Sequence, residues 1–116
     1  MQNKPKYHFF KNRKYALDGL AIAVKTESSF RLELLFSIFI IVAILLIDTS
    51  LTNKLILLVT GILVLIVELV NSAIENVVDL VTKEIHPLAK SAKDMGSTAV
   101  MFSISLHLSC WLVVCF

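Results

Sequence analysis

Glycine is scarce in this chain, and its scarcity excludes the common nucleotide-binding loops. The 116 residues include three glycines, Gly19, Gly61 and Gly96, which lie far apart. A P-loop or a GxGxxG turn needs several glycines close together, because the backbone must approach the phosphates. The signature segments of soluble protein kinases are also absent. A nucleotide site in this chain must therefore be built from side chains and helix ends.

Cysteines and charged residues are also few. Cys110 and Cys115 lie in one apolar run, five residues apart, so on a helix they point about 140° from each other. We expect no intrachain disulfide, and no CxxC or His/Cys pattern for zinc occurs. Charged residues make up 17% of the chain and hydrophobic residues 57%. An ordinary soluble domain is about 25% charged and about 45–50% apolar, so the extra apolar surface requires lipid or partner chains.

Three uncharged apolar runs predict an all-α membrane protein, a single membrane domain over residues 1–116. The runs cover residues 34–47, 55–67 and 95–116. The third reaches the roughly 20 residues that a spanning helix needs. The first two are shorter, but a polar turn at 48–53 joins them as a helical hairpin, and the second continues to Val81 without a breaker. We expect transmembrane helices over residues 31–48, 52–82 (with a cytoplasmic extension) and 95–116.

Positive charge gathers near the N-terminus and sets the expected orientation. Seven of the eleven lysines and arginines precede residue 32, and three lie in the connection 82–94. Basic segments favour the cytoplasmic side, so the N-terminus and this connection should be cytoplasmic. Within residues 1–29, basic and apolar side chains fall on opposite helical faces, which predicts an interfacial amphipathic helix. Glu27 should lie near the membrane boundary, either on this helix or where the chain turns into the membrane.

A polar stripe in the second apolar segment is the strongest sign of chemistry. Glu68, Asn71, Glu75 and Asp79 are spaced by three, four and four residues, so they share one helical face. A carboxylate in hydrocarbon costs roughly 3 kcal/mol or more and marks a functional site by default. The alternative is that these groups only form hydrogen bonds between helices. Both interpretations favour an oligomer, because three helices of one chain cannot enclose the stripe.

Depth in the membrane suggests two roles for the carboxylates. Glu68, the deepest, suits a general base acting on the hydroxyl of an apolar substrate. Glu75 could hold Mg²⁺ together with Glu27, since Mg²⁺ favours one or two carboxylates plus substrate phosphates. The connection 82–94 contains His86-Pro87, and a proline ends a helix or restricts the residue before it. We therefore expect the third helix to begin near Asp94, with Gly96 and Ser97 in its first turn. Lys93 and the free backbone N–H groups there would then form a phosphate cradle, unless Lys93 merely reaches toward the membrane interface.

Two segments resemble the signature of the prokaryotic diacylglycerol kinase family. They read Glu68-Leu-Val-Asn71-Ser-Ala-Ile-Glu75-Asn-Val-Val-Asp79 and Ala92-Lys93-Asp94-Met-Gly96-Ser97, and the similarity extends over nearly the whole chain. The Met-Gly-Ser form is similar to the enzymes of Gram-negative bacteria. The resemblance implies a homotrimeric bundle in the bacterial inner membrane, with active sites shared between neighbouring chains. It also implies transfer of phosphate from ATP to 1,2-diacylglycerol, with Mg²⁺, to make phosphatidic acid.

The resemblance also implies roles for individual residues. Glu68 would be the catalytic base, and Glu27 and Glu75 would hold Mg²⁺ and the nucleotide. ATP would also contact Tyr15, Glu84, Ile85, His86, Lys93 and Asp94, and the lipid side would be lined or supported by Arg31, Glu33, Asn71, Ser97 and Trp111. Two positions depart from the family pattern, since His8 stands where arginine is common and Asp18 replaces a frequent basic residue. The part of His8 in substrate binding therefore stays open, and Lys11 or Arg13 could compensate.

Other functions remain beside a diacylglycerol kinase. An undecaprenol kinase of the same family fits as well, because the apolar residues do not distinguish one polyprenol from two acyl chains. A small proton-coupled transporter also uses an embedded glutamate, but it would usually have four spans and an aromatic-lined pocket. A pore-former of the holin type would leave the polar stripe without a use. For the kinases we expect direct in-line transfer, which depends mainly on positioning and charge neutralisation; the alternative is a covalent phospho-aspartate.

Overall fold

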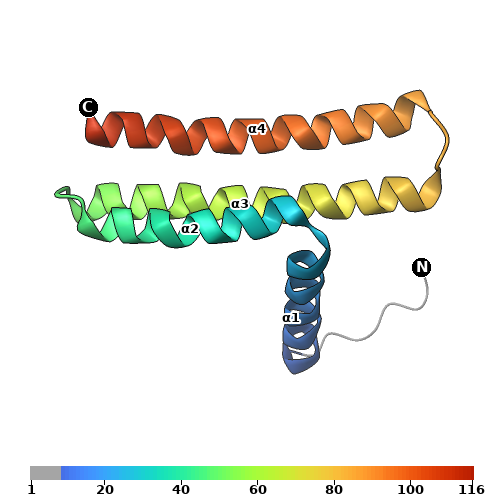
Figure 1. The fold of residues 1–116 in the computed structure, drawn as a ribbon, viewed down its shortest axis with the longest axis horizontal. Coiled ribbons are helices and arrows are strands. Elements are labelled where there is room, and N and C mark those ends of the chain that lie inside the picture. Colours follow the sequence, from blue (N-terminus) through green and yellow to red (C-terminus); the bar gives the residue numbers. More distant parts are fainter. Residues whose placement is uncertain (1–8) are drawn as a thin grey trace.

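The computed structural model describes residues 9–116, with side chains described from residue 11, and they form four helices. These are α1 (Phe9–Thr26), α2 (Ser28–Leu46), α3 (Leu51–Val81) and α4 (Pro87–Cys115). The three longer helices run side by side, and α1 stands crosswise to them at the α2 N-terminus (Figure 1). His8, one of the two departures from the family pattern, lies outside the described residues.

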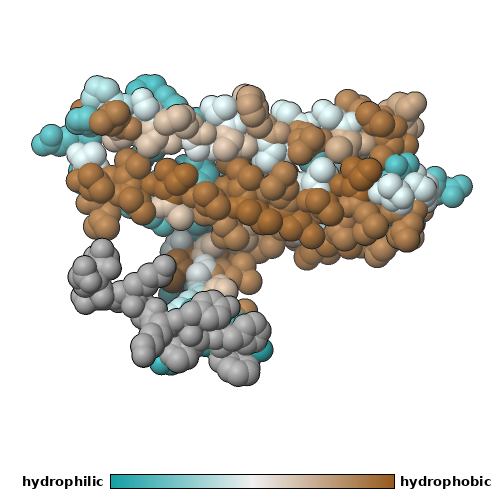
Figure 2. Space-filling model, turned by 180° about the vertical axis from the view of Figure 1, so that it is seen from behind, coloured by the Kyte–Doolittle hydropathy of each residue, from teal (hydrophilic) through white to brown (hydrophobic). Residues whose placement is uncertain are grey.

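The three long helices carry their apolar side chains on the outside. Each of α2, α3 and α4 is long and apolar enough to cross a membrane. Figure 2 shows the resulting apolar surface, with hydrophilic residues gathered toward the ends of the bundle. With 31 and 29 residues, α3 and α4 extend about 46 and 44 Å, beyond the roughly 30 Å of a hydrocarbon core. The expected all-α class with three apolar helices is confirmed, and the chain is a multi-pass membrane protein.

A short polar turn joins α2 to α3, as the sequence predicts. The Ser50 hydroxyl accepts a hydrogen bond from the Asn53 backbone N–H at 3.1 Å, and Asn53 Nδ2 donates to Thr49 Oγ1 at 2.8 Å. Serine is a favoured N-cap because its oxygen satisfies an N–H group that has no partner within the helix. Lys54 Nζ donates to the Leu45 carbonyl at 3.0 Å, across the turn. The turn therefore ends one helix and starts the next within a few residues.

The elbow between α1 and α2 is a single non-helical residue, Glu27. Its backbone is extended, with φ −106° and ψ 103°, so of the two alternatives that the sequence left open, the chain turns at Glu27. Arg31 Nη1 donates to the carbonyls of Val24 and Lys25, each at 2.9 Å. A cation is favourable at a helix C-terminus, where carbonyl groups lack partners within the helix. Arg31 of α2 thus holds the last turn of α1 and fixes its crosswise position.

The fourth helix begins earlier than the sequence suggested. It starts at Pro87, seven residues before Asp94, so the expectation of a start near Asp94 was wrong. Proline suits the first helical position because its φ is preset and its missing N–H needs no partner. The ring of His86 caps the turn, since its Nδ1 accepts from the Leu88 N–H at 3.1 Å. Proline and its cap therefore start the helix instead of ending one.

A closed polar network joins α3 to α4 near the α2–α3 turn. Trp111 Nε1 donates to His107 Nε2 at 3.1 Å; because indole only donates, that ring nitrogen carries no proton. His107 Nδ1 lies 2.8 Å from Thr60 Oγ1, which itself lies 2.8 Å from the Ile56 carbonyl. The proton of the neutral ring then lies on Nδ1, which donates to Thr60 Oγ1, and Thr60 Oγ1 donates to the Ile56 carbonyl. Every polar side-chain group of the network therefore has a partner. His107 and Thr60 are both buried, so the network stabilises the packing of the two helices.

Candidate active site

A polar pocket of about 210 Å³ lies where the α1–α2 elbow meets α3 and α4. Its lining combines Glu27 at the elbow and Ser29 in the first turn of α2 with residues of the two long helices. These are Glu68, Asn71, Ser72 and Glu75 from α3, and Ser97 and Val100 from α4. Helical spacing alone aligned the α3 residues, but only the elbow and the α3–α4 packing bring the other two segments to them. Five of the residues predicted to form a site thus share one pocket: Glu27, Glu68, Asn71, Glu75 and Ser97.

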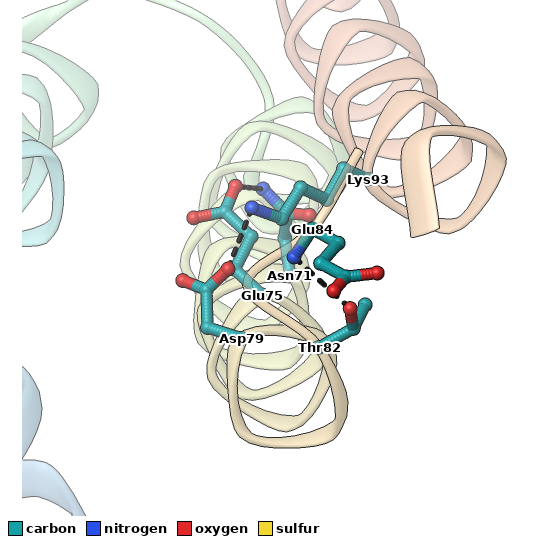
Figure 3. Close-up of polar contacts among 6 residues, drawn as sticks. All are labelled: Asn71, Glu75, Asp79, Thr82, Glu84 and Lys93. Carbon is teal, nitrogen blue, oxygen red and sulfur yellow. Dashed lines mark hydrogen bonds and ion pairs between the residues drawn. The ribbon is translucent and has the colours of Figure 1, made fainter. Parts of the chain in front are cut away.

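Asn71 and Glu75 are joined inside the pocket. Asn71 Nδ2 donates to Glu75 Oε1 at 3.2 Å (Figure 3). The other amide atom, Asn71 Oδ1, is buried and has no hydrogen-bond partner. Glu68 is only 8% exposed, although it is a carboxylate. Buried polar groups in folded proteins are nearly always paired, so the buried Glu68 carboxylate in a polar pocket indicates a place that is built to bind something polar.

Glu33 connects the polar pocket to a larger apolar cavity. Its side chain interacts with that of Glu68, and its Oε2 is buried without a hydrogen-bond partner. Glu33 also lines a cavity of about 430 Å³ between α2, α3 and α4, whose other lining residues are mostly aliphatic. A polar pocket thus adjoins an apolar one, and Glu33 and Glu68 stand where the two meet.

Lys93 and Asp94 point to different partners. Lys93 Nζ reaches across to Asp79 Oδ1 on α3 at 2.7 Å (Figure 3), and Glu75 adds to the negative field at Lys93. Asp94 instead pairs with Lys90 of its own helix at 2.6 Å. Because α4 starts at Pro87, the backbone N–H groups at 93 and 94 lie inside a helix. The predicted phosphate cradle of free N–H groups at this point is therefore wrong, while the Lys93 side chain remains beside the stripe.

The remaining predicted residues lie away from the pocket. Glu84, Ile85 and His86 are exposed in the connection between α3 and α4, where the Glu84 N–H donates to Thr82 Oγ1 at 3.0 Å (Figure 3). Tyr15 on α1 is 55% exposed. Trp111 belongs to the His107 network, fourteen residues or about 21 Å along α4 from Ser97. Arg31 binds the carbonyl groups at the end of α1. A single chain therefore does not bring these predicted residues together around the pocket.

Comparison with known proteins decides the family. The family model for prokaryotic diacylglycerol kinase matches residues 14–115. The chain belongs to this family. It is 39% identical to the diacylglycerol kinase of Pseudomonas aeruginosa over 100 residues, which cover 86% of this chain and 81% of the relative. It is 37% identical to the diacylglycerol kinase of Escherichia coli K12 over 86% of the chain and 82% of the relative, and 33% identical to that of Haemophilus influenzae over 85% and 84%.

Membership in the prokaryotic diacylglycerol kinase family makes the chain an enzyme, a lipid kinase. The predicted enzyme class is thus confirmed, and the chain does not belong to a family of transporters or of structural pore-formers. The match covers all four described helices except the first residues of α1. It therefore includes every residue that lines the polar pocket.

Three pocket residues were missed by the sequence analysis. Ser72 follows Glu68 by four residues and precedes Glu75 by three, so helical spacing alone could have added it to the stripe. Val100 follows Ser97 by three residues within the helix that the sequence predicted, so the same spacing could have added it. Ser29 carried no signal, because its position depends on the elbow at Glu27.

The pocket fits the way in which Mg²⁺ binds beside a nucleotide. Among residues 11–116 no group of three or more His, Cys, Asp or Glu side chains could hold a metal ion alone. Glu27 and Glu75 nevertheless line the same polar pocket. Two carboxylates that leave the remaining positions to substrate phosphates and water are typical of Mg²⁺ sites in kinases. The donor set is thus compatible with a metal that arrives with the nucleotide.

Proposed function

We propose that this chain transfers the γ-phosphoryl group of ATP to the free hydroxyl of 1,2-diacylglycerol, giving phosphatidic acid. The observation that carries the proposal is the polar pocket with Glu27, Glu68 and Glu75, which adjoins an apolar cavity through Glu33. A diacylglycerol molecule has the matching character, since it carries one hydroxyl beside long acyl chains. The relatives named diacylglycerol kinase support the same substrate.

Glu68 would act as the general base of this reaction. Its carboxylate would accept the proton of the lipid hydroxyl while the hydroxyl oxygen forms a bond to the γ-phosphorus. The bond from that phosphorus to the bridging oxygen of ADP breaks in line, and ADP leaves. Glu68 is suited to this step because it is buried among polar pocket residues and lies next to Glu33, at the edge of the apolar cavity. General-base catalysis is worth about 10²- to 10⁴-fold in rate.

The other pocket residues would neutralise and position the phosphates. Glu27 and Glu75 would hold Mg²⁺, which supplies positive charge to the phosphate oxygens when it is bound. Asn71 keeps the carboxylate of Glu75 in place through the hydrogen bond of its Nδ2. Lys93 is the nearby cation that a phosphate could draw away from Asp79, because that ion pair is about half exposed. Phosphoryl transfer needs mainly such positioning and charge.

The arrangement of the helices supports a location at the cytoplasmic face of the bacterial inner membrane. With α3 and α4 crossing the membrane, the crosswise α1 would lie in the headgroup plane, as an amphipathic surface helix does (Figure 1). The basic N-terminal segment would then be cytoplasmic. The site residues that stay outside the pocket, such as Tyr15 and Glu84, favour a homotrimer with active sites shared between chains. The many exposed apolar side chains of the long helices would then contact lipid or partner chains.

Parallel assays of two lipid acceptors test the proposal. The purified chain in detergent–lipid micelles is given radiolabelled ATP with dioleoylglycerol or with undecaprenol, with and without Mg²⁺. Mg²⁺-dependent label in phosphatidic acid is expected. Label mainly in undecaprenyl phosphate would replace the acceptor while keeping the site, and label in neither lipid would refute the proposal. The Asp48→Asn variant is the matched control, because Asp48 lies in the α2–α3 turn, far from the pocket.

A further inference from the structure

The residue that faces Asn71 from α4 is Gly96, and the space between them admits no side chain. Gly96 is buried within the α3–α4 packing. A Cβ atom at this position would collide with Asn71 Oδ1 and lie 3.1 Å from Asn71 Cγ. The three nearest atoms all belong to Asn71, and the third is already 3.9 Å away. The steric conflict at Gly96 therefore concerns the Asn71 carboxamide specifically.

The hydrogen bond to Glu75 explains why the carboxamide lies so close to Gly96. The carboxylate of Glu75 accepts hydrogen bonds from its neighbour, so the amide must turn Nδ2 toward it. Oδ1 then points the other way, toward α4, where it is buried and has no N–H or O–H partner. A Cα–H bond of Gly96 points toward Oδ1 instead. Contacts between a Cα–H group and an oxygen are weak, but they recur where helices pack closely.

We infer that Gly96 is a positioning residue of the active site, which lets the α4 backbone hold the Asn71 carboxamide in the orientation that fixes Glu75. Any larger residue would displace Oδ1 and turn Nδ2 away from the Glu75 carboxylate. The consequence for Mg²⁺ and ATP rests on the proposed function, in which Glu75 is a ligand. The orientation of Asn71 does not rest on it, and the two can be tested separately.

The other two glycines provide matched controls. Gly61 also lies in the α3–α4 interface, where a Cβ atom would come within 3.2 Å of His107 Cε1. It faces the closed network and lines the apolar cavity, but it does not line the polar pocket. Gly19 on α1 has no atom within 4 Å of the Cβ position. The Gly61→Ala variant therefore measures the cost of crowding this interface, and Gly19→Ala measures the cost of the substitution itself.

The orientation of Asn71 can be measured without any catalysis. The chain has five asparagines, so selective ¹⁵N-asparagine labelling gives a small set of side-chain amide signals, and Asn71→Ser identifies the Asn71 pair by its loss. We expect Gly96→Ala to shift the Asn71 pair, and Gly61→Ala and Gly19→Ala to leave it in place. An unshifted Asn71 pair in a folded Gly96→Ala protein would overturn the inference, whatever the activity of the enzyme.

The effect on the site is measured by the Mg²⁺ requirement. Loss of a group that orients a metal ligand typically costs about 10- to 100-fold in metal affinity or activity. We expect Gly96→Ala to raise the Mg²⁺ concentration for half-maximal phosphorylation by such a factor and to leave the KM for the lipid unchanged. An equal rise of this Mg²⁺ concentration in the Gly61→Ala variant would show that Gly96 acts only through the packing of the two helices. If the unaltered chain phosphorylates neither lipid, the proposed function fails while the amide signals still decide the orientation.

A double variant keeps the inference testable if Gly96→Ala does not fold. Removing the carboxamide with Asn71→Ala takes away the two atoms that the new methyl group would meet first. The thermal stability of the Asn71→Ala/Gly96→Ala protein should therefore equal that of Asn71→Ala alone, because the two substitutions act through one contact. Additive losses would show that Gly96 acts through other neighbours and would contradict the inference.

Discussion

The α3–α4 interface places a glycine of one helix against a polar side chain of the other at two positions. Near the α2–α3 turn, Gly61 faces His107, and near the elbow, Gly96 faces Asn71. In the first region the polar groups of Trp111, His107 and Thr60 satisfy one another and end on a backbone carbonyl. In the second region Oδ1 of Asn71 and Oε2 of nearby Glu33 have no partner. The closed network stabilises the packing of α3 and α4, whereas the second region lines the polar pocket with the carboxylates of Glu68 and Glu75. The comparison therefore separates a region that is closed by its own hydrogen bonds from one that lines the proposed active site.

The largest expected effect comes from the reactive region. We expect Glu68→Gln to lower kcat by about 10²- to 10⁴-fold, the usual contribution of a general base, because glutamine keeps the shape but does not accept the proton. The assay is transfer of label from ATP to dioleoylglycerol, with size-exclusion chromatography to show that assembly persists. Full activity in Glu68→Gln would remove Glu68 from the chemistry, and Asp48→Asn should match the unaltered protein.

Glu75→Gln should act mainly on the metal requirement. We expect the Mg²⁺ concentration for half-maximal activity to rise roughly 100-fold, near the upper end of what perturbed metal sites show. Glutamine keeps an oxygen toward Asn71 Nδ2 but loses the negative charge that a cation needs. Titration of activity against Mg²⁺ at saturating ATP measures the effect. An unchanged Mg²⁺ curve would mean that Glu75 is not a ligand, and that Glu27 must find another partner.

A substitution in the closed network should affect stability and leave catalysis unchanged. His107→Leu removes the hydrogen bond to Thr60 of α3 and leaves the Trp111 N–H without an acceptor. We expect a loss of about 1 kcal/mol, typical of hydrogen bonds between membrane helices. The measurement is unfolding in a denaturing detergent, compared with Ser109→Ala, in which an exposed hydroxyl that bonds only its own helix is lost. His107 also lines the apolar cavity, so kcat is measured at saturating lipid, where the value for the folded fraction should be unchanged. A fall in kcat with normal stability would erase the distinction between the two regions.

The smallest effect on stability is expected at the Asp79–Lys93 ion pair. Its side chains are 47% and 44% exposed, and exposed pairs contribute little because water and salt screen them. Asp79→Asn should therefore lower stability only slightly, and the difference should vanish at high salt. Lys90→Gln, which breaks the pair with Asp94 along α4, is the comparison. A large and salt-independent loss for Asp79→Asn would place this pair among the structural contacts.

Local sequence signals predicted most of the fold. Apolar runs and the polar turn at 48–53 are short-range features, and the helices follow them closely. The elbow at Glu27 was one of two alternatives that the sequence left open. The start of α4 was the main error, because a proline ends one helix and begins another equally well. The capping ring of His86 decides between these two outcomes, and its orientation cannot be deduced from spacing. The trimer and the surface position of α1 stay predictions, since they depend on partner chains and on lipid.

The candidate site was predictable where it lies on one helix. Glu68, Asn71 and Glu75 share a face because of the helical repeat, so their alignment follows from the order of residues alone. Glu27 was expected beside Glu75 because of its depth in the membrane, and Ser97 was expected from the family resemblance. Periodicity alone predicts neither contribution to the pocket. The roles of Arg31 at the elbow and of Trp111 beside His107 were not foreseen in this form, because both depend on contacts between helices.

The amino-acid sequence by itself determined that this chain is an apolar helical protein with a carboxylate stripe on its longest helix. Its motifs also indicated the family. These properties are local, since hydropathy and the helical repeat act over a few turns. Only the tertiary structure decided which residues meet the stripe. The elbow at Glu27 brings a third carboxylate to the pocket, beside Glu68 and Glu75. Gly96 lets α4 approach Asn71 closely enough to orient it toward Glu75. Such contacts join residues far apart in the chain, and they depend on the volume and direction of side chains that no spacing rule encodes.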